Sequence, residues 1–130
     1  MTTDLTMLVA TGLLCLFIPL IYGVGRAQTP GGMEWGIGNR AEPFKAPEWA
    51  ERAQRAHLNL VENLTPFAIL VLVAHVAGKA NGWTALGAEA FFWARIAHVA
   101  VYTAGITGIR TAVFFLGTVG EVLILVQLFR

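Results

Sequence analysis

The chain has 130 residues, of which 56% are hydrophobic and only 13% charged, and its formal net charge at pH 7 is +1. A soluble domain usually carries about a quarter charged residues, so these charges are too few to cover a globule, and the mean hydropathy of +0.64 indicates that lipid is the solvent. The small net charge and the lack of a basic tract argue against a nucleic-acid partner.

The first apolar segment, about residues 5–24, is expected to be a retained membrane helix. It has Asp4 where a signal peptide would have a positive region, and about 20 apolar residues suffice to span a bilayer. Pro19 is expected to kink it.

Three further apolar segments follow, at about residues 53–77, 85–105 and 110–129. Each is close to the ~20 residues that a membrane crossing needs. The two connections after the second segment are short, which makes consecutive helices antiparallel neighbours. We therefore expect an all-α membrane protein, with residues 1–130 forming one bundle of four transmembrane helices.

The long loop, about residues 26–51, sets the expected orientation. With four spans, this loop and the third connection lie on one side of the membrane, and both termini lie on the other. The loop side holds most of the cations: Arg26, Arg40, Lys45, Arg52, Arg55 and Arg110, against Lys79 and Arg130 opposite. The positive-inside rule then predicts a cytoplasmic loop and outside termini, in what we expect to be a bacterial inner membrane.

Polar residues recur on single helix faces at the cytoplasmic end. Arg55, Asn59 and Glu62 are spaced i, i+4 and i+7 on the second segment. On the third segment, Arg95, His98 and Tyr102 are spaced i, i+3 and i+7.

Arg95 lies near the middle of its segment, where an arginine costs at least ~2.5–3.5 kcal/mol to insert, so it is expected to face protein or a polar cavity. The simple alternative to a binding role is a structural ion pair with Glu62 or Glu121; the depths of Arg95 and Glu121 agree within roughly 3 Å.

Metal and haem sites are not expected. Bis-histidine haem needs two histidines at one depth, whereas His75 and His57 differ from His98 by roughly 15 Å and 12 Å. No HxxxH motif or Cys/His cluster is present to bind a metal. Cys15 has no polar neighbour within its own segment, so a nucleophilic role is not expected.

The remaining cations, amide, acid and phenol suit a small polyanionic zwitterion. Arginine binds carboxylates bidentately, and a buried glutamate can bind an ammonium group. For Arg55 and Arg110 alone, snorkelling to the membrane interface is the simpler interpretation; their clustering with the other polar groups favours a binding site.

Two motifs carry a family resemblance: RAHLNLVE at residues 55–62 followed by Pro66 and Phe67, and RIAHVAVY at residues 95–102 followed by Arg110 and Thr111. Together they resemble the second and third helices of the MAPEG family, membrane-associated proteins in eicosanoid and glutathione metabolism, in a bacterial-type member. The resemblance covers nearly the whole chain.

The resemblance implies a homotrimer with glutathione bound between neighbouring subunits as a cosubstrate. Arg55, Asn59, Glu62, Arg95, His98 and Tyr102 would bind the peptide, and Arg110 would be the catalytic residue. A cation near the sulfur favours the nucleophilic thiolate, which would attack a lipophilic electrophile or reduce a peroxide.

The sequence departs from the family pattern at Leu58, where some members carry an arginine, and at Phe114, which lacks a hydroxyl. The spacing from Tyr102 to Arg110 also differs slightly from that of catalytic members. Because the family includes non-catalytic lipid-binding members, a membrane protein that binds lipid or a protein partner is the alternative. A small transporter is a third hypothesis.

Small residues are expected to support assembly. Gly117 and Gly120 on the fourth segment, with Ala94, Ala97 and Ala100 on the third, allow close helix approach.

Overall fold

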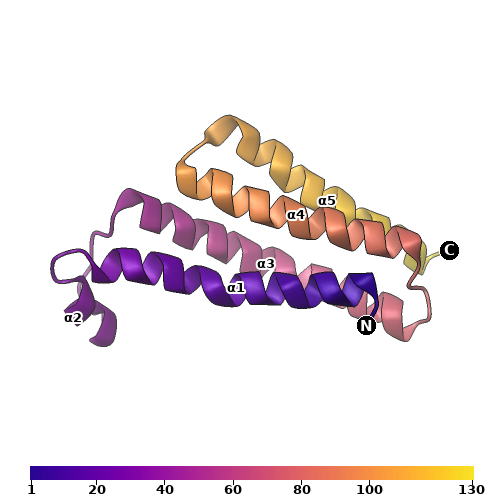
Figure 1. Ribbon diagram of the computed structural model, residues 1–130, viewed down its shortest axis with the longest axis horizontal. Helices are drawn as coiled ribbons and strands as arrows, with labels where there is room; N and C mark the ends of the chain where they lie inside the picture. Colours follow the sequence, from indigo (N-terminus) through magenta and orange to yellow (C-terminus); the bar gives the residue numbers. More distant parts are fainter.

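The computed structural model describes all residues, 1–130, and contains five helices and no strand. The elements are α1 (Thr3–Ala27), α2 (Gly32–Ile37), α3 (Glu48–Val76), α4 (Gly82–Ala104) and α5 (Thr107–Leu128). Each expected apolar segment corresponds to one long helix, with ends that agree to within a few residues, and both termini lie at the same end of the molecule (Figure 1).

The long loop differs from expectation in two ways. It contains the short helix α2, which the sequence did not indicate, and α3 begins at Glu48, five residues before its apolar part at Ala53. Pro47 is the residue before α3, and its fixed φ and missing N–H suit a helix start. The interval 38–47 is not helical.

Three helices, α1, α3 and α5, are long and apolar enough to cross a membrane. The exception is α4, which is also long, at 23 residues, but is less apolar because Glu89, Arg95 and His98 lie within it. The expectation of four equivalent spans is therefore met for three helices.

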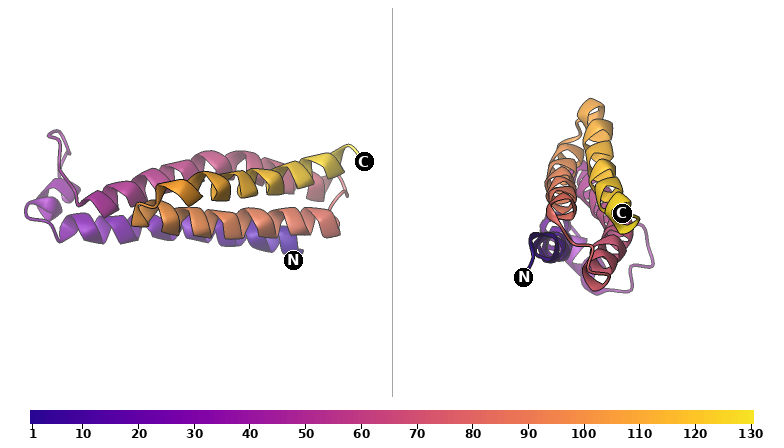
Figure 2. Two further views of the ribbon diagram at one scale, coloured as in Figure 1. Left: turned by 90° about the horizontal axis from the view of Figure 1, so that it is seen from above. Right: turned by 90° about the vertical axis from the view of Figure 1, so that its right-hand side faces the viewer.

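The long helices do not pack evenly. The helices α1, α3 and α4 contact one another, whereas α5 packs mainly on α4, touches α3 and makes no contact with α1. Towards its N-terminal end α5 tilts away from α1 and α3 (Figures 1 and 2). A pocket lined by residues of α3, α4 and α5 lies at this end of the helices.

The apolar core lies in the half of the molecule nearer the termini. Its six buried residues come from α3, α4 and α5: Phe67, Val71, Ala74, Ala88, Phe91 and Ile124. The rings of Phe67 and Phe91 stack with centroids 3.9 Å apart. Offset or stacked aromatic pairs add to the free energy of burial, so this contact fixes α3 against α4.

The ends of α4 are defined by local hydrogen bonds. At its start, the Asn81 side chain accepts from the backbone N–H of Trp83 and Thr84, and the Thr84 hydroxyl accepts from the N–H of Asn81. This reciprocal capping box satisfies N–H groups that the helix leaves unpaired. At its end, Gly105 has φ 81°, a left-handed conformation that glycine adopts without strain.

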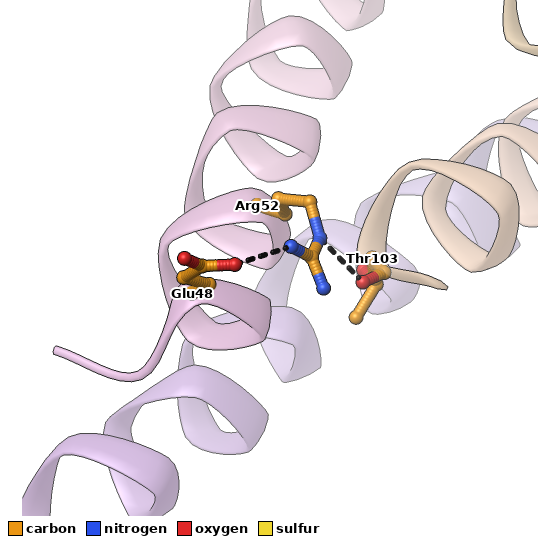
Figure 3. A network of polar contacts seen from close by, with 3 residues as sticks. All are labelled: Glu48, Arg52 and Thr103. Atoms are coloured by element: carbon orange, nitrogen blue, oxygen red, sulfur yellow. Dashed lines mark hydrogen bonds and ion pairs between the residues drawn. The ribbon is translucent and has the colours of Figure 1, made fainter. Parts of the chain in front are cut away.

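Arg52 ties the start of α3 to the end of α4. Its Nε donates to the backbone oxygen of Thr103 at 3.0 Å, and its Nη1 lies 3.5 Å from a carboxylate oxygen of Glu48 (Figure 3). Thr103 is in the last turn of α4, where backbone oxygens lack partners within the helix. Arg52 therefore acts as a helix cap, and this contact holds the α4–α5 turn beside α3.

The glycines of α5 pack within the chain. A Cβ built on Gly120 would lie 2.5 Å from the backbone oxygen of Gly87, and one on Gly87 would lie 2.6 Å from that of Gly120. The guanidinium of Arg95 occupies the space next to Gly117, where its Nη2 would lie 2.8 Å from an added Cβ. The close approach that these glycines were expected to give between subunits is instead used between α4 and α5.

We expect Gly120→Ala to lower the midpoint of thermal unfolding in detergent. The added methyl meets backbone atoms that cannot move aside, and overpacking of this kind costs about 1–3 kcal/mol. Gly12→Ala is the matched control because nothing lies within 4 Å of its would-be Cβ, and alanine is the better helix former. Equal midpoints for the two variants would contradict the tight α4–α5 crossing.

Candidate functional site

A pocket of about 330 Å³ lies between α3, α4 and α5 beside the α4–α5 turn. Its lining residues are Asn59, His98, Tyr102, Arg110, Thr111, Phe114 and Phe115. Four of these, Asn59, His98, Tyr102 and Arg110, are among the seven site residues expected from the sequence. Each helix contributes one side: Asn59 from α3, the histidine and tyrosine from α4, and the rest from the first turns of α5.

The polar groups of the pocket are stacked on one another. The guanidinium of Arg110 lies over the ring of Tyr102, 4.6 Å from its centroid. The Tyr102 ring meets His98 edge to face at 5.6 Å, and Phe114 lies 6.2 Å from the same imidazole. These aromatic contacts fix the side chains in place.

Three of these side chains make no hydrogen bond to the rest of the chain. No partner within the protein is present for the Arg110 guanidinium, the Tyr102 hydroxyl or the ring nitrogens of His98. His98 is only 4% exposed as a residue, but its ring nitrogens are not among the buried atoms that lack a partner, so they are accessible at the pocket that they line. These three groups are therefore free to bind a polar ligand.

Arg95 adjoins the pocket but does not line it, and its guanidinium is already engaged. Its Nη1 donates to Oδ1 of Asn59 and its Nη2 to Oδ1 of Asn63, each at 3.3 Å. The guanidinium also lies over the rings of Phe91 at 4.8 Å and Phe114 at 5.0 Å. With 1% of its surface exposed, Arg95 is the largest fully buried side chain.

Arg95 makes no direct ion pair with Glu62 or Glu121, the two partners considered from the sequence, although the Glu121 carboxylate still interacts with its charge at longer range. Glu62 is exposed on the outer side of α3, and the only ion pair in the chain joins Arg52 to Glu48. One carboxylate oxygen of Glu121 is buried without a hydrogen-bond partner, and so is Nε of Arg95. Neutral amides take the place of the carboxylate because Asn59 and Asn63, one turn apart on α3, both face Arg95.

Arg55 and Glu62 do not join the pocket within one chain. Both are exposed, and neither makes a hydrogen bond or ion pair. The i, i+4, i+7 spacing with Asn59 places the three on one broad face of α3, but Asn59 is at its inner edge, towards α4. Of the three expected α3 residues, only Asn59 therefore lines the pocket, and Arg55 and Glu62 face outward.

Residues that the sequence did not single out complete the surroundings. Asn63 and Phe91 hold Arg95, and Phe115 lines the pocket. The i+4 spacing of Asn63 from Asn59 could have indicated that both amides lie on the same face of the helix. Between α1 and α3, Sγ of Cys15 lies 3.5 Å from Nε2 of His57, whose Nδ1 is 3.2 Å from the Tyr22 hydroxyl; this contact joins helices that are separate in sequence.

The fold and the pocket define an integral membrane protein, all helical, with a cationic and aromatic pocket at one end of its bundle. A family model of the MAPEG family matches residues 6–130. The chain belongs to the MAPEG family, which includes membrane glutathione transferases and peroxidases. A comparison with curated proteins found no match.

We expect Arg95→Gln to lower the thermal unfolding midpoint strongly, since it leaves the amides of Asn59 and Asn63 without their charged donor. A hydrogen bond to a charged group contributes about 1.5–3 kcal/mol. The control is Arg110→Gln, which also removes one arginine but no hydrogen bond within the chain, and which should change the midpoint little. A larger loss in the control would show that the two arginines have the opposite roles.

Proposed function

We propose that this protein is a glutathione-dependent transferase or peroxidase that acts on a lipophilic electrophile through a thiolate stabilised by Arg110. The observation that carries the proposal is the convergence of three uncommitted polar side chains, His98, Tyr102 and Arg110, on one pocket without an acidic residue. A cation and a phenol near a sulfur favour its ionised form, which is the nucleophile.

The thiol end of glutathione fits the pocket chemically. In conjugation, the thiolate sulfur forms a bond to an electrophilic carbon of the second substrate, and the leaving group takes the electron pair of the broken bond. In peroxide reduction, the sulfur attacks the peroxide oxygen and an alcohol leaves; a second glutathione then yields the disulfide and water. In both reactions Arg110 stabilises the sulfur anion, and the Tyr102 hydroxyl is placed to donate to it.

The pocket of one chain supplies no acid for the ammonium group of glutathione. Glu62 and Arg55 lie exposed on the outer face of α3, where they are available to a neighbouring copy. A homotrimer with glutathione between subunits would bring these two residues to the pocket of the next chain. This arrangement would explain why a single chain leaves two unpaired charges, those of Arg55 and Glu62, on a membrane surface where unpaired charge is costly.

The second substrate is expected to enter from the lipid. Phe115 lines the pocket and is 59% exposed on the outer surface of α5. The pocket therefore opens at the boundary with the membrane, while Arg110 lies near the α4–α5 turn, which we place on the cytoplasmic side of a bacterial inner membrane. Glutathione would enter from water and the electrophile from the bilayer.

We expect Arg110→Ala to abolish conjugation of glutathione to a model aryl halide while leaving helix content and oligomer size unchanged. The reason is that the variant loses the cation beside the sulfur and one stacking contact with Tyr102, but no hydrogen bond or ion pair between helices. The measurements are product formation, circular dichroism and light scattering in detergent. Wild-type activity in Arg110→Ala would remove this residue from the mechanism.

A second prediction separates catalysis from the alternative function, a non-catalytic membrane protein that binds lipid or a partner. If Glu62 binds the ammonium group, Glu62→Gln should raise the glutathione concentration needed for a given thermal shift about tenfold, the loss expected for one charge-assisted bond. The oligomer size should not change. Glu42→Gln is the control, because it makes the same change at an exposed carboxylate that lines neither pocket. The alternative would be favoured if glutathione caused no thermal shift in the wild type and Glu62→Gln disrupted the oligomer.

A further inference from the structure

A second pocket, of about 400 Å³, lies at the end of α1 and shares no residue with the α3–α4–α5 pocket. It is formed by the last turns of α1, by α2 and by Gln54 of α3, and we call it the α1–α2 pocket. Figure 1 shows α2 beyond the end of α1, away from α4 and α5. Within one chain, the pocket is therefore separate from the α3–α4–α5 pocket.

Two arginines of this pocket gather on one indole ring. The guanidinium of Arg26 lies 5.8 Å from the centroid of the Trp35 ring, and that of Arg40 lies 5.3 Å from it. Trp35 is itself fixed, because its Nε1 donates to the backbone oxygen of Glu42 at 2.7 Å and its ring stacks on Phe44. Two like charges held on one platform repel each other and favour an anion between them.

No acidic side chain lines the pocket, and neither arginine forms an ion pair. Arg26 is held by the side-chain oxygen of Gln54 and lies over the Tyr22 ring, and Arg40 donates twice to the backbone oxygen of Gly36. These partners are neutral and leave the positive charge uncompensated. Arg40 also has φ 55°, a left-handed conformation that is unfavourable for arginine, and such strain is concentrated at binding sites.

The pocket continues into an apolar surface. Gly23 lines it, and a Cβ built there meets nothing within 4 Å. Leu16 and Leu20, which precede it by about two turns and one turn on the outer side of α1, are 66% and 61% exposed, and Ile37 of α2 is 82% exposed. A ligand with an anionic group and an apolar chain matches this combination of cations and exposed apolar side chains.

We propose that the α1–α2 pocket binds the phosphate group of an anionic lipid, with its acyl chain lying along the outer face of α1. The cations attract the phosphate, and the indole and the small residues give it space at the height of the membrane interface. A lipid headgroup and free phosphate would make the same contacts with the two arginines. The apolar surface next to the arginines favours the lipid.

The test is native mass spectrometry of the full-length protein, delipidated in detergent and titrated with phosphatidylglycerol. Arg40→Asn should weaken binding about fivefold, the effect of one arginine near a lipid surface, and should leave the fold intact because asparagine tolerates the left-handed conformation. Gly23→Leu should abolish binding by filling the pocket while keeping both charges. Lys45→Gln is the matched control: it removes one exposed cation of the same loop that does not line the pocket, and it should bind as the wild type does.

Four results would overturn the proposal. Equal losses in Arg40→Asn and Lys45→Gln would show unspecific attraction to the loop, and unchanged binding in Gly23→Leu would place the lipid elsewhere. Phosphatidylcholine that binds as tightly as phosphatidylglycerol would remove the role of net anionic charge. Inorganic phosphate that displaces the lipid at equal concentration would assign the site to a soluble anion instead.

Discussion

The buried guanidinium of Arg95 is the constraint on which the arrangement of α3, α4 and α5 depends. Removing a charged group from water costs several kcal/mol unless hydrogen bonds and polarisable groups replace the water. Here the two amide oxygens of Asn59 and Asn63 and the rings of Phe91 and Phe114 surround the charge. Because these groups come from three helices, one side chain determines both the rotation and the depth at which the helices meet.

The same contacts build the proposed site. Asn59 and Phe114 each touch Arg95 on one side and line the α3–α4–α5 pocket on the other. One arginine is thus committed to structure, and a second, Arg110, is held only by stacking on Tyr102. A guanidinium that stays free of hydrogen bonds within the protein keeps its donors for a ligand, so the division of roles between the two arginines is a physical one.

Much of the fold could be predicted from the sequence because an apolar run of about 20 residues has few alternatives to a membrane helix. The meeting of Asn59, His98, Tyr102 and Arg110 also followed, since antiparallel connections place their segments at one end. The partners of Arg95 could not be predicted. Depth along a helix follows from 1.5 Å per residue, but which side chains face each other depends on helix rotation, and this rotation selected Asn59 and Asn63 over Glu62 and Glu121. For the same reason the sequence did not show that Gly117 and Gly120 pack within the chain, nor that the long loop folds α2 onto the end of α1.

The two proposed ligands are anions of different kinds, and their pockets lie at the end of the molecule near the α4–α5 turn. On the α4–α5 side, the cation lies beside an exposed phenylalanine, Phe115, so a polar ligand and an apolar one can meet at the membrane boundary. On the α1 side, both cations rest on Trp35, and exposed leucines extend away from them along the helix. A bound anionic lipid there would neutralise Arg26 and Arg40 and add contacts to the short helix α2. Because Arg110 lines the other pocket, the lipid would leave this cation available to a soluble thiol peptide, and the two pockets could be filled at the same time.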